Sequence, residues 1–229
     1  MQTHNTLDIR LESKPSDSYR VSRIRNDYDY NQSTVTEHVK GILTTPEEWH
    51  IGLIVGSSGS GKSTIAKTLG LHTNLRPETR HASIIDDMPT TSSVQEITDV
   101  FTHLGFSSIP NWLKPYSALS TGEKMRADLA YTILSQNADL AFDEYTSVVD
   151  REVAENISIA LHKAILHTDK RITLISCHRD VIPWLQPDWI YDTDERTNID
   201  PKTSSAPLKN TLSESAHEAN GTNYPDIII

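Results

Sequence analysis

The strongest constraint on the fold is the stretch GSSGSGKST at residues 56–64, which fits the phosphate-binding template G-x-x-x-x-G-K-[ST]. The apolar run at residues 51–55 precedes it, and a helix-compatible segment at residues 64–71 follows it. This order predicts a strand, a loop and a helix, which is the context that the template requires. A chance Gly/Ser-rich turn is the alternative, but it leaves the flanking strand and helix unexplained.

Glycines in such a loop let successive backbone N–H groups turn inward and form an anion-binding nest at a helix N-terminus. Lys62 is predicted to reach the β- and γ-phosphates, and Ser63 to offer its hydroxyl to Mg²⁺. We therefore expect the chain to bind a nucleoside triphosphate. The loop residues predicted to contact it are Gly56, Ser57, Ser58, Gly59, Ser60, Gly61, Lys62, Ser63 and Thr64.

The length of 229 residues suits one domain with tails and allows a sizeable core. The sequence has no run of about 18–20 apolar residues, which a membrane span requires. Its start lacks a basic stretch followed by an apolar segment. The one cysteine, Cys177, excludes an internal disulfide and fits a reducing compartment. These features predict a cytoplasmic protein without membrane insertion.

The net charge of −10 argues against a strongly basic nucleic-acid-binding surface, because phosphate contacts dominate such binding. Arg20, Arg23 and Arg25 are nevertheless closely spaced. We interpret them as the exposed face of a strand, with a local basic patch as the alternative.

Three regions are expected along the chain. Residues 1–16 are polar without periodicity, which predicts a mobile N-terminus. Residues 17–193 form the predicted domain, and the polar segment 194–229 is expected to be largely disordered. Strands are predicted at residues 19–24, 33–42, 51–55, 80–85, 140–142, 172–176 and 189–191. Helices are predicted at residues 64–70, 94–104, 121–136 and 151–167, with a linker at 110–115.

Alternating strands and helices around a phosphate-binding loop predict an α/β fold of the P-loop NTPase type. Its parallel core sheet would be covered by helices, with the ligand at the carboxyl ends of the strands. The β-rich N-terminal stretch predicts an added antiparallel subsheet.

Asp143 and Glu144 follow the apolar strand predicted at residues 140–142. An aspartate at a strand end can hold the Mg²⁺ shell, as in a Walker B site, and the next carboxylate can orient the attacking water. Acidic pairs after strands are common. The position of this pair, about 80 residues after Lys62, favours the Walker B interpretation.

A third motif, Leu119-Ser120-Thr121-Gly122-Glu123, stands about 23 residues before Asp143. Here the chain resembles the ATP-binding-cassette (ABC) family, whose signature is LSGGQ. Thr121 replaces the first glycine and Glu123 replaces the glutamine. A serine and a glycine at a helix N-terminus present a hydroxyl and N–H groups to an anion, and Ser120 is also the expected N-cap.

Two further segments match the same family. Ser147-Val148-Val149-Asp150 resembles its D-loop, S-x-x-D, although Asp150 is also an expected N-cap. His178, after the strand predicted at 172–176, matches the switch histidine that senses the γ-phosphate. The resemblance covers residues 19–193, and the five motifs follow the family's order.

The resemblance implies an ATP hydrolase in which two chains form a head-to-tail homodimer around ATP and Mg²⁺. Its implied catalytic residues are Glu144, which positions the water, His178, which holds the γ-phosphate, and Lys62. Ser63 and Asp143 would ligate the metal. Ser120 and Gly122 would complete the partner's site, and Asp150 would span the interface. Tyr28 or Tyr30 would stack on adenine, with core packing as the alternative for either.

The chain also departs from the family. Asp86 and Asp87 stand where the family places a glutamine, so either would contact the Mg²⁺ shell or the water; the nearest glutamine, Gln95, lies in a predicted helix. Tyr145 replaces the proline usual after the Walker B glutamate. Lys62 and Ser120 are only 58 positions apart, which implies a shortened helical subdomain, the part on which transporter membrane partners dock.

The strings NWLKPY at 111–116 and WLQPDW at 184–189 resemble a soluble ABC group of phages and mobile elements. That group is sometimes fused to a predicted acetyltransferase domain, for which this chain has no room; core packing is the alternative for the tryptophans.

We therefore expect a stand-alone ATPase that acts as a nucleotide-driven switch on another macromolecule, nucleic acid or protein. It would work in the host cytoplasm if phage-encoded. The alternatives are the ATPase subunit of a membrane transporter and a non-ABC P-loop kinase or nucleotide sensor, which leaves the signature and His178 unexplained.

Overall fold

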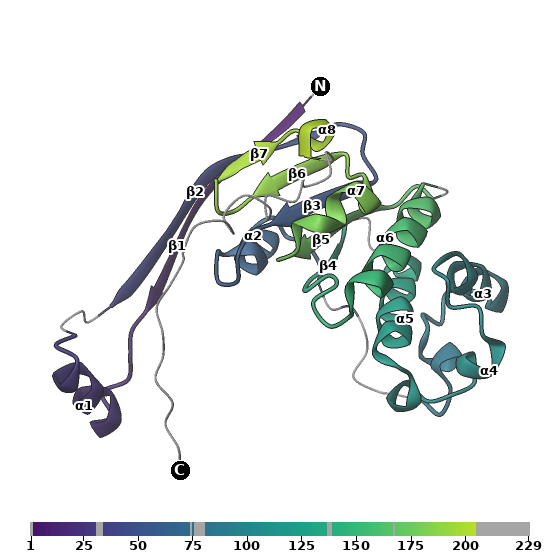
Figure 1. The fold of residues 1–229 in the computed structure, drawn as a ribbon, viewed down its shortest axis with the longest axis horizontal. Coiled ribbons are helices and arrows are strands. Elements are labelled where there is room, and N and C mark those ends of the chain that lie inside the picture. The colour runs from purple at the N-terminus through teal and green to yellow at the C-terminus, as the bar shows by residue number, and fades with distance from the viewer. Residues whose placement is uncertain are drawn as a thin grey trace, which may run out of the picture.

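The computed structural model describes residues 2–30, 34–73, 75, 81–136, 139–166 and 168–204, without the side chains of residues 11, 13, 35–37 and 204. The described residues form a five-stranded sheet and a two-stranded hairpin. Figure 1 shows helices packed on the larger sheet, a helical region beside it and the long hairpin. Within these ranges no helix combines the length and the apolar character needed to cross a membrane.

The core sheet has the strand order β4-β5-β3-β6-β7. Its strands are β3 (Ile51–Val55), β4 (Asp139–Phe142), β5 (Arg171–Ser176), β6 (Trp189–Asp192) and β7 (Thr197–Ile199). The first four strands in this order pair in parallel, and β7 pairs antiparallel to β6. All residues of β3 are buried because this central strand is covered on both faces. The predicted parallel core sheet is confirmed.

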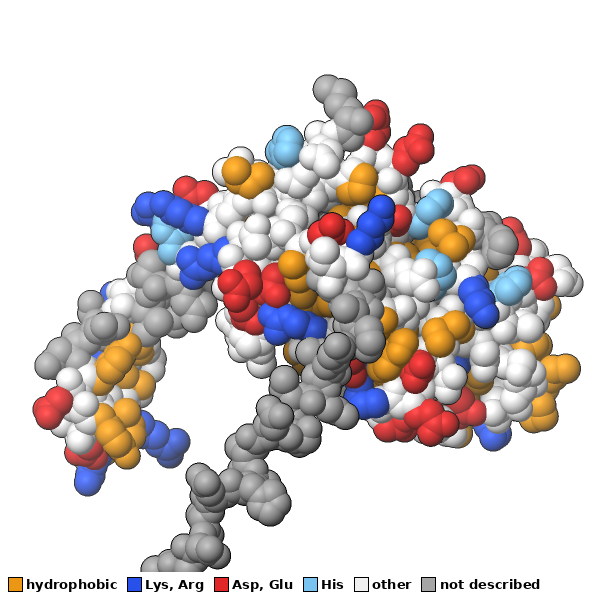
Figure 2. Space-filling view, turned by 45° about the horizontal axis from the view of Figure 1, so that its top comes forward, with side chains coloured by type: hydrophobic (Ala, Val, Ile, Leu, Met, Phe, Trp, Pro, Cys, Tyr) orange, Lys and Arg blue, Asp and Glu red, His pale blue; other side chains and the backbone are white. Residues whose placement is uncertain are grey.

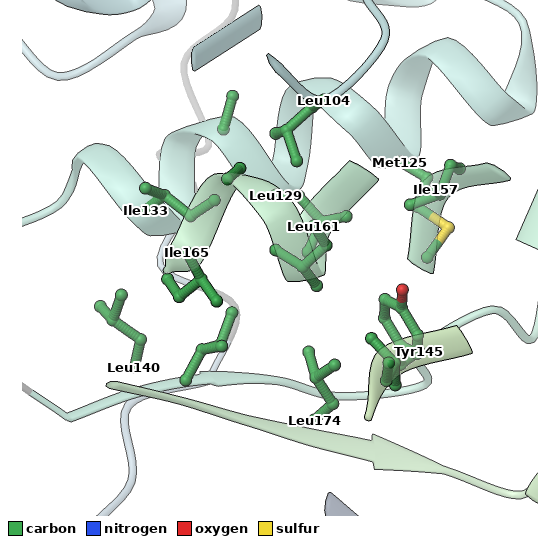
Figure 3. Packing of buried hydrophobic residues seen from close by; sticks show 14 of the residues in the cluster. Leu104, Met125, Leu129, Ile133, Leu140, Tyr145, Ile157, Leu161, Ile165 and Leu174 are labelled. Carbon is green, nitrogen blue, oxygen red and sulfur yellow. The ribbon is translucent and has the colours of Figure 1, made fainter. Parts of the chain in front are cut away.

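The two faces of the sheet carry different cores because side chains alternate along a strand. Leu53 and Val55 belong to the larger core, which is covered by α5 (Thr121–Leu134) and α6 (Arg151–Ile165). Figure 3 shows residues of both helices above Leu140 and Leu174 of the sheet. Ile54 belongs to the smaller core, beneath α2 (Lys62–Thr68) and the hairpin.

The hairpin pairs β1 (Gln2–Ser13) with β2 (Val35–Pro46) in antiparallel register. Its near part packs on the sheet through Leu7, Val39 and Leu43, all buried. Its far part projects from the body and carries α1 (Tyr19–Asp27), which has no buried residue (Figure 1). Figure 2 shows hydrophobic and basic side chains on this separate lobe, where Tyr19 and Tyr28 are each 76% exposed.

The antiparallel subsheet is confirmed, but two predictions for its strands are wrong. Residues 2–13, expected to be irregular, form β1, in which Leu7 is buried in the smaller core and Ile9 packs against it. Residues 19–24, predicted as a strand, lie in α1. There the Ser18 hydroxyl accepts from Val21 N at 3.3 Å, and Arg23 pairs with Asp27 one turn later. These local contacts favour a helix over a strand. The predicted strand 33–42 corresponds to β2, with position 33 outside the described residues.

The helical region is built from short elements. These are η1 (Ile84–Asp87), α3 (Val94–His103), α4 (Ile109–Trp112) and η2 (Tyr116–Ala118). The helix predicted at 94–104 is confirmed. The strand predicted at 80–85 is wrong, because Ile84 begins a 3-10 turn and position 80 is not described. The linker predicted at 110–115 begins as α4, which packing stabilises: the Phe101 ring lies 5.8 Å from that of Trp112.

Part of the tail predicted as disordered is ordered. After η3 (Arg179–Val181), α7 (Ile182–Leu185) and β6, the chain forms β7 and α8 (Pro201–Ser204). The Asn198 amide donates to Thr44 O at 2.9 Å, and its oxygen accepts from Thr44 N at 2.8 Å. A polar residue thus joins β7 to the hairpin, which the composition did not indicate. Residues 205–229, including the Ile-rich end, lie outside the described part.

Candidate nucleotide-binding site

The phosphate-binding loop connects β3 to α2, as predicted. Gly61 is the N-cap of α2 and has φ 90°, a backbone conformation that residues with a Cβ rarely adopt. A Cβ on Gly56 would lie 2.0 Å from the Thr193 hydroxyl oxygen, so this position has no room for a side chain. At Gly56 and Gly61 the template therefore requires glycine for steric reasons.

Hydrogen bonds hold the loop from inside and from behind. The Lys62 ammonium donates to Gly56 O at 2.9 Å and to Ser57 O at 2.6 Å. The Ser57 hydroxyl donates to Asp194 at 2.7 Å, and Ser57 N donates to the same carboxylate at 2.9 Å. The hydroxyl oxygens of Ser60 and Thr193 lie 2.5 Å apart. The loop is therefore supported by the segment that follows β6.

A cavity of about 430 Å³ opens in front of the loop. Its walls come from the loop and α2 on one side and from the ends of β4 and β5 on the other. The lining residues are Ser58, Gly59, Gly61, Lys62, Ser63, Thr64, Asp143, Glu144, Ser147, Ile175 and Cys177. The structure thus brings residues of the predicted phosphate-binding loop and the predicted Walker B pair to one cavity. Gly56, Ser57 and Ser60 do not line it and lie in the supporting part of the loop.

The acidic pair lies in a turn with unusual backbone geometry. Asp143 is half-buried and its carboxylate accepts from Glu144 N at 2.9 Å, while Glu144 is exposed to the cavity. Glu144 has φ 55° and Thr146 has φ 63°. Such left-handed geometry costs about 1–3 kcal/mol for a non-glycine residue and occurs preferentially at functional sites.

His178 follows β5 and stands next to the cavity rather than in its lining. Its Nδ1 lies 3.4 Å from the Thr146 hydroxyl, and its backbone N donates to the Ser176 hydroxyl at 3.1 Å. The preceding residue, Cys177, lines the cavity. The predicted switch histidine is therefore adjacent to the Walker B turn, through Thr146.

The signature residues do not reach this cavity. Ser120 caps α5 in a capping box: its hydroxyl accepts from Glu123 N at 3.3 Å, and its own N donates to the Glu123 carboxylate at 2.8 Å. Asn111 also donates to that carboxylate. Gly122 packs near α6, where a Cβ would meet Val153 at 3.1 Å. Ser120 is exposed, so this helix end is open to another molecule.

Asp150 is the N-cap of α6, as predicted. Its carboxylate accepts from Val153 N at 2.9 Å, and its side chain is exposed. This capping role needs no second molecule. The predicted role at an interface remains a prediction.

Four further residues with predicted nucleotide or magnesium contacts do not line the cavity. Tyr28, the C-cap of α1, and Tyr30 lie at the far end of the hairpin (Figure 1), because β1 and β2 extend beyond the loop before the chain turns. The predicted adenine stacking is therefore not supported in this chain. Asp87 is buried, and it accepts from His81 N and Nδ1 at 2.7 Å and 2.8 Å. Asp86 and Asp87 line a different cavity, of about 340 Å³.

Sequence reasoning missed the residues behind the loop. Arg179 donates to Asp192 at 2.7 Å and to Asp194 at 2.9 Å. The hydrogen bond from the Ser57 hydroxyl, and then that from Arg179, holds the pKa of Asp194 below its usual value. The available signal was an arginine next to the predicted switch histidine, followed by two aspartates. The polar composition of residues 194–229 masks this signal, because it predicts a disordered tail there.

The donor set fits a nucleotide with magnesium better than a metal ion alone. The described residues contain no group of three or more His, Cys, Asp or Glu side chains that could hold a metal. Mg²⁺ usually takes one or two protein oxygens and completes its shell with phosphates and water. The Ser63 hydroxyl and the Asp143 carboxylate, on facing walls of one cavity, match that pattern.

Solved structures resemble this chain in fold. The fold is that of an ABC nucleotide-binding domain. CbiO1 from Clostridium perfringens, part of the ABC transporter complex CbiONQ, matches with TM-score 0.58 and 19% identity over 76% of this chain and 85% of its own. The ATP-binding cassette MJ0796, in a dimeric post-hydrolysis state with ADP and Pi, matches with TM-score 0.57 and 12% identity over 83% and 94%.

A third similar structure is the archaeal ribosome recycling factor aABCE1 in complex with the ribosomal stalk protein aP1. It matches with TM-score 0.50 and 17% identity, over 62% of this chain and 35% of its own. No protein-family model and no curated protein matches the chain. At these identities the likeness establishes the ABC fold and leaves the activity to be argued from the site.

Proposed function

We propose that the chain is an ABC-type ATPase that binds and hydrolyses ATP–Mg²⁺ at composite sites of a head-to-tail homodimer. The observation that carries the proposal is the cavity itself, which is lined both by the predicted phosphate-binding loop and by the Asp-Glu pair that directly follows β4. Each half of this arrangement occurs separately in many proteins. Their meeting in one cavity supports nucleotide hydrolysis.

Each residue has a role that its chemistry allows. Lys62 turns from the loop carbonyls toward the phosphates, and the loop N–H groups bind the same anion. Ser63 and Asp143 would hold the magnesium ion, which would neutralise charge on the phosphates. Glu144, exposed in the cavity, orients the attacking water and accepts its proton. His178 donates a hydrogen bond to the γ-phosphate from its place beside Thr146.

The position of the signature residues supports a dimer. Ser120 is exposed and Gly122 half-buried at the N-terminus of α5, and neither lines the chain's own cavity. In a head-to-tail pair this helix end covers the partner's γ-phosphate, and Asp150 lies at the interface. The dimeric state of MJ0796 supports the proposal by fold.

We assign the dimer a switch role on another macromolecule, nucleic acid or protein, in the cytoplasm. The short helical region favours this role over transport. The relation to phage and mobile-element ATPases also stays a proposal. Two of the tryptophans in the strings that suggested it have contacts inside this fold: Trp112 donates to Phe106 O at 2.7 Å, and the Arg151 guanidinium lies over the Trp184 ring.

The ATPase subunit of a transporter is the second candidate. Ile109 and Leu113, on and after α4, are 61% and 62% exposed. Exposed apolar residues on the helical region are what a membrane partner would need for docking. Asp86 and Asp87, which replace the glutamine of that docking groove, argue against it.

The test measures ATP turnover by the purified chain with Mg²⁺, alone and with DNA, RNA or membrane extract. Specific activity should rise with protein concentration, because two chains complete each site. Stimulation by nucleic acid supports the switch, and stimulation by membranes alone supports the transporter subunit. Absence of turnover under every condition and concentration rejects the ATPase.

A further inference from the structure

Tyr145 stands between the two residues with left-handed backbone, Glu144 and Thr146, and its side chain is fully buried. Its backbone is tied to β5 on both sides of the residue. Tyr145 N donates to Ile175 O at 2.8 Å, and the Ser176 hydroxyl donates to Tyr145 O at 2.9 Å. The Walker B turn is therefore fixed to the strand that leads to His178.

The Tyr145 hydroxyl reaches the opposite side, to α6. It lies 2.9 Å from the Ser158 hydroxyl oxygen. Ser158 donates its own proton to Ala154 O at 2.7 Å, so Tyr145 must be the donor in this pair. Burial raises the pKa of Tyr145 above its usual value, so the hydroxyl keeps its proton at neutral pH.

The ring fills a gap in the larger core. Figure 3 shows it below Met125 and Ile157, on the face that α5 and α6 cover. The Phe142 ring approaches it edge-on at 6.2 Å. Packing alone would be served equally well by phenylalanine, so packing does not explain the hydroxyl.

The contacts of Tyr145 lead to the residues with proposed roles. The Ser176 hydroxyl that binds Tyr145 O also accepts from His178 N. The next residue, Thr146, places its hydroxyl beside His178 Nδ1. The preceding residue is Glu144. One buried side chain thus connects the Walker B turn, the segment with His178 and α6.

We propose that Tyr145 is a positioning residue, whose hydrogen bond to Ser158 on α6 holds Glu144 and His178 in their relative places. The proposal rests on the proposed ATPase function. Tyr145 does not line the cavity and acts only through its neighbours. Loss of its hydroxyl lets the strained turn relax, which moves the Glu144 carboxylate while the phosphate-binding loop stays in place.

The experiment compares wild type with Tyr145→Phe, Ser158→Ala and the double variant. We expect kcat to fall roughly three- to tenfold in Tyr145→Phe with KM for ATP unchanged, because one buried hydrogen bond is lost and the loop is intact. Ser158→Ala should lower kcat at least as much. The double variant should be no slower than the slower single variant, because both act through one bond.

Tyr191→Phe on β6 is the matched control. Tyr191 is also fully buried, and its hydroxyl has no hydrogen-bond partner among the described residues. Its kcat should equal that of wild type. Thermal melting of all variants accompanies the kinetics, so that a general loss of stability is separated from a loss of positioning.

The outcomes separate the two proposals. If wild type hydrolyses ATP and Tyr145→Phe has the same kcat, the positioning role is rejected and the ATPase stands. The positioning role is also rejected if the losses of kcat in the two single variants add up in the double variant. It is rejected too if kcat falls together with a raised KM and a proportionally lower Tm, because Tyr145 then acts through packing alone. A wild type without turnover rejects the ATPase and the positioning role together.

Discussion

Asp194 supports the phosphate-binding loop from a position far along the chain. Its carboxylate accepts from both the hydroxyl and the backbone N of Ser57, and it pairs with Arg179. These contacts stabilise the charged carboxylate in the folded chain. The residue thus connects the rear of the loop to the turn after His178.

The pH dependence of stability follows from the lowered pKa of Asp194. The unfolded chain binds a proton near the ordinary aspartate pKa of 3.8, whereas the folded chain binds it only at lower pH. The carboxylate therefore contributes stability above the unfolded pKa, which is lost as pH falls through the folded pKa. We expect Asp194→Asn to lower Tm at neutral pH, with a difference from wild type that shrinks below about pH 4.

Melting curves across this pH range test the expectation. Asp99→Asn serves as the control, because Asp99 is an exposed residue of α3 whose one contact shown is with Gln95. It should melt like wild type at every pH. A Tm difference for Asp194→Asn that persists unchanged in acid would contradict the role of its charge.

At the scale of elements, the N-termini of α3 and α5 share the same capping arrangement. Ser93 on α3 and Ser120 on α5 both cap their helices in a capping box, with Glu96 and Glu123 as the reciprocal partners. Each cap contributes about 0.5–2 kcal/mol to stability. Only Ser120 belongs to the signature motif, so the two caps provide a matched pair.

Ser120→Arg should block ATP-dependent dimerisation while each monomer still binds ATP. The bulky cation would occupy the surface that meets the partner's phosphate, whereas the cavity of the same chain is untouched. Ser93→Arg removes an equivalent cap and should leave dimerisation intact. Gel filtration with ATP measures the dimer, and a fluorescent ATP analogue measures binding; loss of binding in Ser120→Arg, or of the dimer in both variants, would argue against the composite site.

At the scale of the whole molecule, the proposed reaction couples hydrolysis to the separation of two chains. Glu144→Gln keeps the size of the side chain and removes the base. We expect turnover to fall roughly 100-fold or more, because a general base is lost, while ATP binding persists. The variant should therefore accumulate as an ATP-bound dimer in gel filtration.

Glu152→Gln, an exposed change in the first turn of α6, is the control for Glu144→Gln. It should turn ATP over at the wild-type rate and show no stable dimer. An unchanged ATPase rate in Glu144→Gln would reject the assigned role of this carboxylate. Loss of turnover without a trapped dimer would leave Glu144 as the base and reject the switch.

The local pattern predicted much of the core and of the cavity, for identifiable reasons. Residues 51–71 and 140–144 each form a strand followed by a polar turn, and parallel strands bring such turns to the same edge of a sheet. Lys62, Ser63, Asp143 and Glu144 accordingly line one cavity, while their roles stay predictions. Tyr28 and Tyr30 lie away from this cavity, because sequence distance from the loop does not reveal how far a hairpin extends.

Misassigned elements share a physical cause. Residues 19–24 include the aromatic Tyr19 and the β-branched Val21 and Ile24, which favour a strand. The Ser18 cap and the Arg23–Asp27 pair nevertheless stabilise a helix there. Residues 197–204 are polar, yet Asn198 gains two backbone hydrogen bonds from β2. Short segments follow the contacts that the rest of the fold offers, which composition does not contain.

The sequence by itself determined the fold class, the phosphate-binding loop and the acidic pair, because these depend on residues close together in the chain. Tertiary structure alone decided what supports them. Asp194 meets Ser57 across 137 positions, and Tyr145 meets Ser158 only after α6 packs on the sheet. Hydrogen bonds between distant segments form only once the hydrophobic core has brought those segments together, so no local sequence pattern predicts them.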